Sequence, residues 1–361
     1  MNIPENWNNK PLGTVIDDIG DGGTPNTNRS EYFGGSVPWV VIQDIKKHIS
    51  STKTSLTELG LKSCSAKLWP AGTVILSTGA TIGEVGIAEV PLATKQGIHG
   101  IVCSDEVSSE FLYYKLSTLR DFLKANAQGS TIREVRAPFI RTIPISFPSD
   151  KDEQTKIATI LSTLDRAIEQ TEAIIAKQQR IKTGLMQDLL TKGIDEHGII
   201  RSEATHKFKD SPLGRIPVEW EVESLKNLTS KIVDGVHHTP TYVSEGVPFI
   251  TITDITAGEG ISFENVRYVS PSDHTFFVKR ADPRTGDVLV TKDGTLGVAR
   301  IVSADYPEFS IFVSVAQIRP KDKICTPELI WSFFESGEFK DPAWRSLSWN
   351  WACPYTFRAF P

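Results

Sequence analysis

Three residue groups have types and spacings that could serve chemistry, but none forms a complete set. Glu338-Phe339-Lys340 has the Glu-x-Lys form of some metal-dependent nucleases, yet no upstream Asp is placed to complete it. His237-His238 offers two imidazoles for a metal, but no Cys or carboxylate lies at ligand spacing. For this pair, a metal site and a plain turn or loop contact both stay open. The glycine-rich residues 79–86 fit a nucleotide loop or a tight turn after a strand equally well.

Other enzyme motifs do not occur in the sequence. No Gly is followed by Lys, so there is no phosphate-binding loop of the Walker A type. No Asn/Asp-Pro-Pro-aromatic segment is present to clamp a flipped base, which argues against a DNA adenine methyltransferase. The four cysteines, Cys64, Cys103, Cys325 and Cys353, lack the paired spacing of a zinc site. We therefore expect no catalytic residue, no metal and no cofactor in this chain.

Charge and hydropathy limit the class of protein. The sequence has 39 Lys and Arg against 44 Asp and Glu, a net charge of −5, and no basic tail. Contacts with nucleic acid would come from local clusters on a folded surface, or be shared with a basic partner. No apolar run approaches the roughly 18 residues of a membrane span, and the N-terminus is polar. These features predict a cytoplasmic protein without a membrane contact.

The clearest organisational signal is an internal repeat. Trp7 and Trp220 lie 213 positions apart within similar segments. The further matches, in the same order, are Asp21-Gly22 with Asp234-Gly235, Val37-Pro38-Trp39-Val40 with Val247-Pro248-Phe249-Ile250, and Gly72-Thr73-Val74-Ile75-Leu76 with Gly286-Asp287-Val288-Leu289-Val290. The repeat predicts two similar domains.

Short β-branched runs separated by Gly and Pro predict strands in each half, most clearly at residues 37–42, 73–77, 247–253 and 287–291. Residues 111–114 and 329–334 predict matching helices. The matched Asp44 and Asp254 are expected to be turn or scaffold residues. Each half is therefore predicted to be an α+β domain made mainly of β-sheet.

Between the halves the hydrophobic period changes to alternating steps of four and three, over residues 151–192. Ser149 or Asp150 is available to cap the helix that this period predicts, and Gly193 is placed to end it. This period places the apolar residues in a stripe along one face of the helix, and a single helix cannot bury such a stripe by itself. The residues expected to pack against a partner helix are Ile157, Leu161, Leu164, Ile168, Ile175, Leu185 and Leu189.

Two segments carry a family resemblance. The second half opens with Ser211-Pro212-Leu213-Gly214-Arg215 and continues to Trp220, and the helix begins Glu153-Gln154-Thr155-Lys156-Ile157. Both resemble hallmarks of the specificity subunits of type I restriction–modification systems, over residues 1 to about 340. The resemblance implies an α+β fold in which two similar mainly-β target-recognition domains are joined by a long coiled-coil-type helix.

The resemblance also implies domain limits and partners. Residues 1–150 and 211–340 become the recognition domains, 151–192 the spacer helix and 193–210 a linker. The implied partners are double-stranded DNA, two methyltransferase (M) subunits and restriction (R) subunits. S-adenosylmethionine, ATP and Mg would be used by the partner subunits. This chain would be a non-catalytic reader of a bipartite target; an enzyme fused to a reader is the rival that the missing motifs weigh against.

Polar and glycine-rich loops supply the expected DNA contacts. In the first domain these are Thr24, Asn26, Asn28, Arg29, Gln43, Ser77, Thr78, Thr81, Lys95, Gln96 and Arg133. In the second domain they are His237, His238, Thr239, Thr253, Lys292, Thr295 and Gln317.

The end of the chain departs from the repeat. After Lys340 no helical or strand period survives, and three Trp fall within residues 344–351. We expect residues 341–361 to be an aberrant or truncated tail, without the second spacer helix. The alternative function is then a non-functional remnant or half-subunit that self-associates through the exposed helix stripe.

Overall fold

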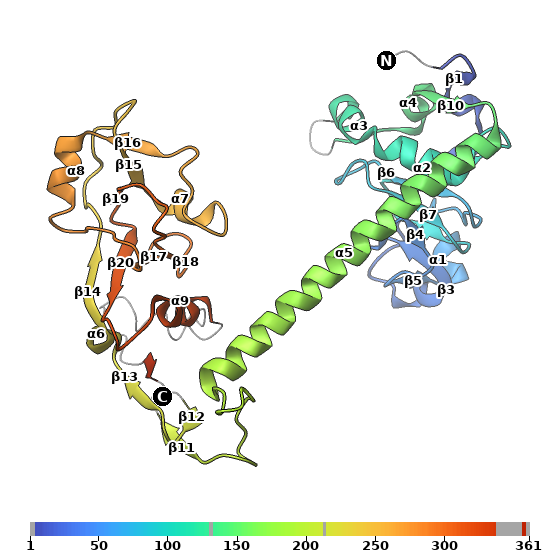
Figure 1. Ribbon diagram of the computed structural model, residues 1–361. Coiled ribbons are helices and arrows are strands. Elements are labelled where there is room, and N and C mark those ends of the chain that lie inside the picture. The colour runs from blue at the N-terminus through green and yellow to red at the C-terminus, as the bar shows by residue number, and fades with distance from the viewer. Residues whose placement is uncertain (1–3, 130–132, 212–213, 337–355, 359–361) are drawn as a thin grey trace. The chain divides into compact units, whose positions relative to one another are not determined.

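The computed structural model describes residues 4–129, 133–211, 214–336 and 356–358 (Figure 1). It divides into two compact units, Met1–Glu172 and Ala173–Pro361. No described helix is long and apolar enough to cross a membrane.

The first unit is built on a five-stranded sheet of order β2-β9-β6-β7-β4. A three-stranded sheet, β5-β3-β8, and a two-stranded sheet, β1-β10, complete it. The strands are β1 Trp7–Pro11, β2 Ile16–Gly20, β3 Phe33–Val40, β4 His48–Ile49, β5 Ser55–Leu56, β6 Val74–Ser77, β7 Val85–Ala88, β8 Ala93–Thr94, β9 Ile98–Cys103 and β10 Pro144–Pro148. The helices are α1 Glu58–Lys62, α2 Ser109–Ser117, α3 Arg120–Asn126 and α4 Ala137–Thr142, with 3₁₀ turns at Leu12–Thr14, Ser30–Tyr32 and Ile42–Asp44. Apolar residues of β2, β6, β9, α2, α3 and α4 form its largest core cluster.

The second unit repeats this plan. Its main sheet has the order β14-β20-β17-β18 and its smaller sheet β16-β15-β19. The strands are β11 Phe208–Ser211, β12 Gly214–Pro217, β13 Glu221–Glu223, β14 Thr229–Asp234, β15 Val247–Ile250, β16 Arg267–Val269, β17 Val288–Thr291, β18 Ala299–Ile301, β19 Ser310–Ile311, β20 Val315–Pro320 and β21 Thr356–Arg358. The helices are α6 Leu225–Leu228, α7 Ile252–Thr256, α8 Pro271–Phe277 and α9 Pro327–Glu335.

Strand order and direction match between the two units. The order β2-β9-β6-β7 corresponds to β14-β20-β17-β18, and β5-β3-β8 to β16-β15-β19. In each smaller sheet the central strand pairs antiparallel with one neighbour and parallel with the other. The predicted pair of similar, mainly-β units is therefore confirmed.

Two predicted strands end earlier than expected, and the matched aspartates explain why. Strand β3 ends at Val40, where the Asp44 carboxylate accepts a hydrogen bond from the Val41 amide at 3.0 Å. Strand β15 ends at Ile250, and Asp254 accepts from the Thr251 amide at 2.7 Å. Each carboxylate takes an amide out of the strand ladder and turns the chain. The scaffold role expected for both aspartates is confirmed.

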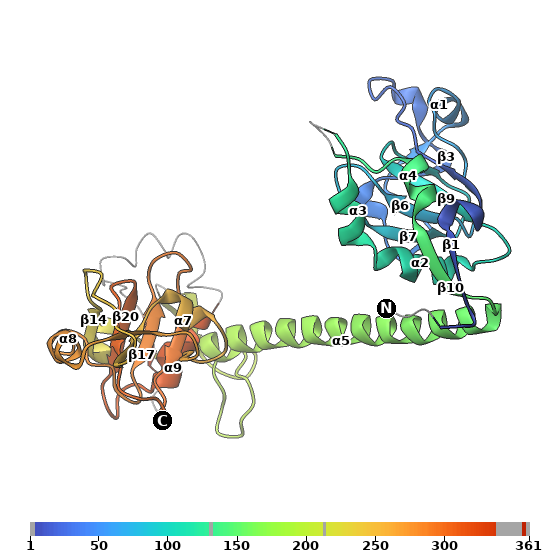
Figure 2. The same cartoon turned by 90° about the horizontal axis from the view of Figure 1, so that it is seen from above.

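The predicted long helix is present as α5, Lys151–Thr191. Its 41 residues give a length of about 61 Å, and Figure 2 shows it without interruption. At its start the Asp150 carboxylate accepts a hydrogen bond from the Asp152 amide at 2.9 Å. Past its end, Gly193 has a φ of +64°, which favours glycine and stops the helix.

The first turn of α5 is anchored to the first unit by Gln154, whose side chain is completely buried. Its Oε1 accepts a hydrogen bond from the Ser108 amide at 2.9 Å. Its Nε2 donates to the carbonyl oxygens of Glu106 and Pro148, both at 2.9 Å. The buried amide thus ties the helix to α2's entry loop and to the end of β10.

Further along α5 the apolar stripe is exposed. Ile157 is half-buried against the first core, but Leu164, Ile168 and Ile175 are 56%, 57% and 62% exposed. Leu185 and Leu189 are also exposed. Among the described residues of each unit, this stripe therefore has little apolar cover.

The predicted tail, residues 341–361, lies outside the described residues except for Thr356–Arg358. These form β21, which pairs antiparallel with β13 as β10 pairs with β1. The sequence pattern does not predict this strand, because no strand period precedes it.

Replacing Gln154 with Ala should destabilise the first unit by about 2 kcal/mol, since it leaves one buried amide and two carbonyls without their partner. The free energy of unfolding can be taken from hydrogen exchange of peptides within residues 1–172. Lys156→Ala, at an exposed position two residues further along α5, is the matched control and should change it by less than about 0.5 kcal/mol. If both substitutions lowered the free energy of unfolding equally, Gln154 would not be the anchor of α5.

Candidate nucleic-acid interface

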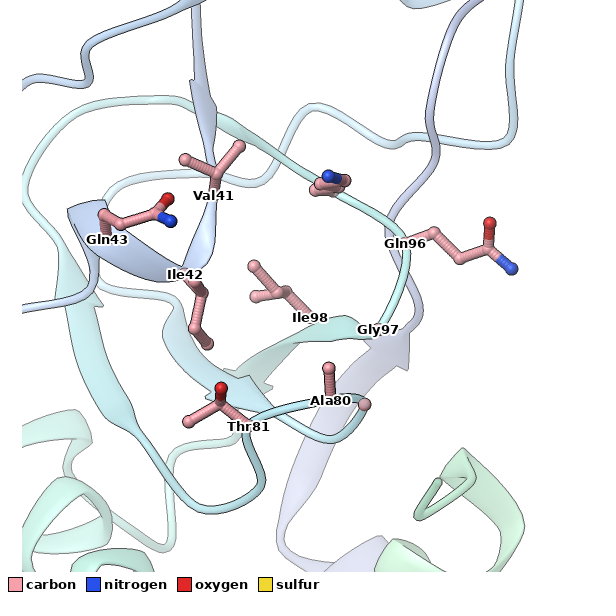
Figure 3. A pocket seen from close by; sticks show the side chains of 10 residues that line it. Val41, Ile42, Gln43, Ala80, Thr81, Gln96, Gly97 and Ile98 are labelled. Carbon is pink, nitrogen blue, oxygen red and sulfur yellow. The ribbon is translucent and has the colours of Figure 1, made fainter. Parts of the chain in front are cut away.

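A hollow of about 200 Å³ opens on the first unit where three loops meet (Figure 3). The loops follow β3, join β6 to β7 and join β8 to β9. The lining residues are Val41, Ile42, Gln43, Gly79, Ala80, Thr81, Lys95, Gln96, Gly97 and Ile98. Four of the residues predicted from the sequence, Gln43, Thr81, Lys95 and Gln96, are brought together here.

Strand pairing places these loops at one edge. Val40 at the end of β3 pairs with Thr94 in β8, and Ser77 at the end of β6 pairs with Ile98 in β9. The amides of Thr78 and Gly79 both donate to the Gly97 carbonyl, at 2.8 and 3.1 Å. A Cβ on Gly79 would lie 3.3 Å from the Gly97 Cα, so glycine allows this close approach.

Polar groups behind the hollow are paired. The Asp21 carboxylate accepts hydrogen bonds from the amides of Gly22 and Gly97, both at 2.8 Å. His99 Nδ1 lies 2.8 Å from the Thr78 hydroxyl and 3.7 Å from Asp21. Burial lowers the pKa of His99 against the opposing effect of Asp21, which favours a neutral imidazole. This network holds the backbone of the loop at Gly97.

The rim of the hollow presents exposed polar side chains. The side chains of Gln43, Thr81, Lys95 and Gln96 are exposed, and none of these side chains has a hydrogen-bond partner within the described parts of the chain. Figure 3 shows the amides of Gln43 and Gln96 on opposite sides of the hollow. Such a rim offers donors, acceptors and a cation to a ligand without breaking an existing bond.

In the second unit the aspartate that matches Asp21 is Asp234, and its hydrogen-bond partners are different. Asp234 is buried where β14 ends, and it receives hydrogen bonds from Lys292 Nζ at 2.6 Å and from Arg280. His237 Nε2 lies 3.1 Å from the same carboxylate. These donors hold the pKa of Asp234 well below its usual range, although burial alone would raise it. One carboxylate thus organises two permanent cations and a histidine, leaving a net positive cluster.

A second hollow, of about 410 Å³, lies beside this cluster. Its lining residues are Val236, His237, His238, Phe276, Phe277, Lys279 and Arg280. The His238 ring contacts the Phe277 ring edge-on at 5.7 Å, while Phe276 is 63% exposed with Lys279 Nζ 5.7 Å from its centre. The sequence analysis found the two histidines but missed Phe276, Lys279 and Arg280. The repeat offered a signal, since Arg280 lies 213 positions after Lys67, which also pairs with an aspartate, Asp18.

Burial corrects three predicted contacts. Ser77, Thr78 and Gln317 are completely buried. Their hydrogen bonds lie within the fold: Ser77 Oγ accepts from the Glu84 amide, Thr78 bonds Gly97 and His99, and Gln317 donates to Asp287 at 2.6 Å. As polar residues within or beside strands they resemble loop positions in the sequence, but they cannot reach a ligand.

Most of the other predicted residues lie at the surface. Asn26, Asn28 and Arg29 are exposed in the loop after β2, with Thr24 half-buried, and Arg29 contacts Glu31 and Tyr32. Arg133 is exposed, and its segment is tied to the Thr78 carbonyl by the Val135 amide at 2.9 Å. The remaining exposed residues in the second unit are Thr239, Thr253 and Thr295.

The possible metal pair gains no further ligands. Within residues 4–129, 133–211, 214–336 and 356–358, no group of three His, Cys, Asp or Glu side chains is placed to hold a metal ion. His237 makes polar contacts with Asp234 and Arg280, and the His238 ring packs against the Phe277 ring.

Comparisons with known proteins agree on one family. Residues 4–178 match the model of the type I restriction modification DNA specificity domain. The MjaIX type I restriction enzyme specificity subunit of Methanocaldococcus jannaschii is 32% identical over 266 residues, which are 71% of this chain and 60% of that subunit. The MjaVIII specificity subunit of the same organism is 26% identical over 80% of this chain and 64% of that subunit. This chain therefore spans less than two thirds of the length of these relatives.

Solved structures agree with the fold. A type I restriction–modification S subunit from M. genitalium aligns over 99% of this chain and 84% of its own, with a TM-score of 0.54 at 16% identity. A chain from a study of complex assembly and conformational transition of the type I R-M system aligns over 99% and 86%, with a TM-score of 0.57 at 17% identity. At such identities the likeness concerns the fold alone. With the matched domain, the duplicated units and the long helix together, the chain belongs to the type I restriction–modification specificity (S) subunit family.

Proposed function

We propose that this chain is the non-catalytic, sequence-specific DNA-binding subunit of a type I restriction–modification complex, and that it reads a bipartite target. Residues 1–150 and 211–340 are the two readers and residues 151–192 the spacer helix. The observation that carries the proposal is the duplication itself. Two units with the same strand order present matched loops and are joined by one long helix. Such an arrangement suits two half-sites at a fixed separation.

The rim of the first hollow has groups suited to base and phosphate contacts. The amide of Gln43 or Gln96 can pair with adenine through one donor and one acceptor in the major groove. Lys95 can neutralise a phosphate. In the second unit, His237 lies in a cationic cluster with Lys292 and Arg280, so phosphate contacts there fall to Lys279, Arg280 and Lys292. His238, Thr239, Thr253 and Thr295 add exposed polar groups for contacts with DNA.

Catalysis is assigned to partner subunits in this proposal. Methyltransferase subunits would supply adenine methylation with S-adenosylmethionine, and restriction subunits would use ATP and Mg. A chain with net charge −5 has fewer cationic than anionic side chains, so it has no overall excess of positive charge for phosphate binding. Basic partner surfaces would therefore share the electrostatic part of DNA affinity.

The exposed stripe of α5 supports a second candidate function. Leu164, Ile168 and Ile175 lie in water along one helix, and burying each would contribute about 1.5–3 kcal/mol. The stripe would thus favour pairing with another helix. A half-subunit would bury the stripe by self-association. The residues through which it would associate are Ile157, Leu161, Leu164, Ile168, Ile175, Leu185 and Leu189.

Exchanging residues 1–150 for the first domain of another family member should change one half-site and leave the other unchanged, because each unit has its own core and its own loops. The measurement is methylome sequencing of cells that express the hybrid with methyltransferase subunits. The parent chain is the control. A simultaneous change in both half-sites would rule out independent readers.

Lys95→Ala should weaken DNA binding about equally for all sequences and reduce the salt slope of the binding constant by about one. Among the described residues of the first unit, the exposed Lys95 ammonium has no hydrogen-bond or ion-pair partner, so its removal costs only the phosphate contact. Lys124→Ala, which removes an equal charge from the exposed face of α3, is the control. A salt slope that stays unchanged in the Lys95 variant, or falls equally in both, would show that Lys95 does not contact phosphate.

A further inference from the structure

The first unit holds α5 at a second place, beyond its first turn. Lys47 Nζ lies 2.5 Å from the Tyr114 hydroxyl and 3.3 Å from the Asp165 carboxylate. The Tyr114 hydroxyl donates to the same carboxylate oxygen at 2.5 Å. Lys47 comes from the segment before β4, Tyr114 from α2 and Asp165 from α5, and α2 lies alongside α5 in both views (Figures 1 and 2). Three segments therefore meet at one carboxylate.

Lys47 is the sheltered member of this contact, whereas the Asp165 side chain is 37% exposed. The Lys47 side chain is 13% exposed, and its ammonium lies 4.6 and 5.6 Å from the ring centres of Tyr114 and Tyr113. Burial and the bond to Asp165 raise the pKa of Tyr114, so its hydroxyl stays protonated as the donor. Hydrogen bonds that involve a charged group are stronger than neutral ones.

Two points of attachment fix a direction, whereas one does not. The first is the buried amide of Gln154. Asp165 follows it by 11 residues, or about 16 Å along the helix. A helix held only at Gln154 could pivot about that point, and the contact at Asp165 opposes the pivot.

The rest of α5 acts as a lever. From the pivot at Gln154 the helix continues to Thr191, which is about 56 Å. A tilt of about 10° about Gln154 would move its far end by about 10 Å, or roughly three base-pair steps at ~3.4 Å each. A small change in the direction of α5 at this contact would thus shift its far end by the length of whole base-pair steps.

The contact is also not part of the duplicated scaffold. Tyr114 lies six residues after the Ser108 cap of α2, and the residue six after the Thr326 cap of α9 is Ser332. A serine at this position is too short to reach as far as the tyrosine hydroxyl. The first unit has therefore acquired a contact that its general fold does not require.

We propose that Lys47, Tyr114 and Asp165 are positioning residues, which set the direction of α5 and thereby the number of base pairs between the two half-sites. The geometric part of the proposal concerns the first unit alone. Its consequence for DNA rests on the proposed function.

The geometric part is tested by pulsed electron paramagnetic resonance with genetically encoded spin labels at the exposed positions of Lys62 on α1 and Glu172 on α5, both within the first unit. The full chain should give a narrow distance distribution. Lys47→Ala and Tyr114→Phe should broaden the distance distribution. Lys47→Arg should keep it narrow, because a guanidinium can still reach Asp165. Lys46→Ala, at the exposed neighbouring lysine, should leave it narrow. Equal widths in all variants, each with its thermal transition retained, would overturn the proposal.

The functional part is tested with the same variants in complex with methyltransferase subunits. The substrates are duplexes whose spacer is native, one base pair longer or one base pair shorter. Lys47→Ala and Tyr114→Phe should lose preference for the native spacer several-fold, while the preference for each half-site sequence is unchanged. Unaltered spacer preference would overturn the proposal even if both half-sites are read. Failure of the unmodified complex to methylate any bipartite target would instead refute the proposed function, and the distance measurement would still decide the geometric part.

Discussion

The side-chain amide of Gln154 is completely buried at the start of α5, and it ties the helix to the first unit. An amide in this position is stable only with partners, and all three of its hydrogen bonds reach other segments. The same helix exposes leucines and isoleucines further along. Polar burial therefore attaches α5 to its own domain, while the apolar surface stays available for association.

The two units show how one scaffold supports different chemistry. Asp44 and Asp254 do the same work, ending a strand by accepting from the next amide. Asp21 and Asp234 occupy matched places but differ in their partners. Asp21 accepts from backbone amides, whereas Asp234 gathers Lys292 and Arg280. One unit thus presents a polar rim and the other a cationic cluster, a difference that fits the proposal that the two units recognise different half-sites.

The sequence predicted the duplication, the main strands and α5 because those features are periodic or recur at fixed offsets. It could not separate Thr78 and Gln317 from surface loop residues, because burial depends on strands distant in the chain. Phe276 and Arg280 were missed for a related reason: Arg280 meets Asp234 only after 46 residues of intervening chain fold. The contact of Lys47 with Asp165 spans 118 residues and carries no local signal.

We propose that the length and direction of α5 determine the spacing of the DNA target. The most direct measurement inserts one heptad after Ile168, in a complex whose opposing helix is lengthened to match, and maps the methylated sites. The insertion keeps the apolar stripe in phase and adds about 10 Å to the helix. We expect unchanged half-sites with a spacer longer by roughly three base pairs. An unchanged spacer, with both half-sites still methylated, would show that α5 does not set the distance.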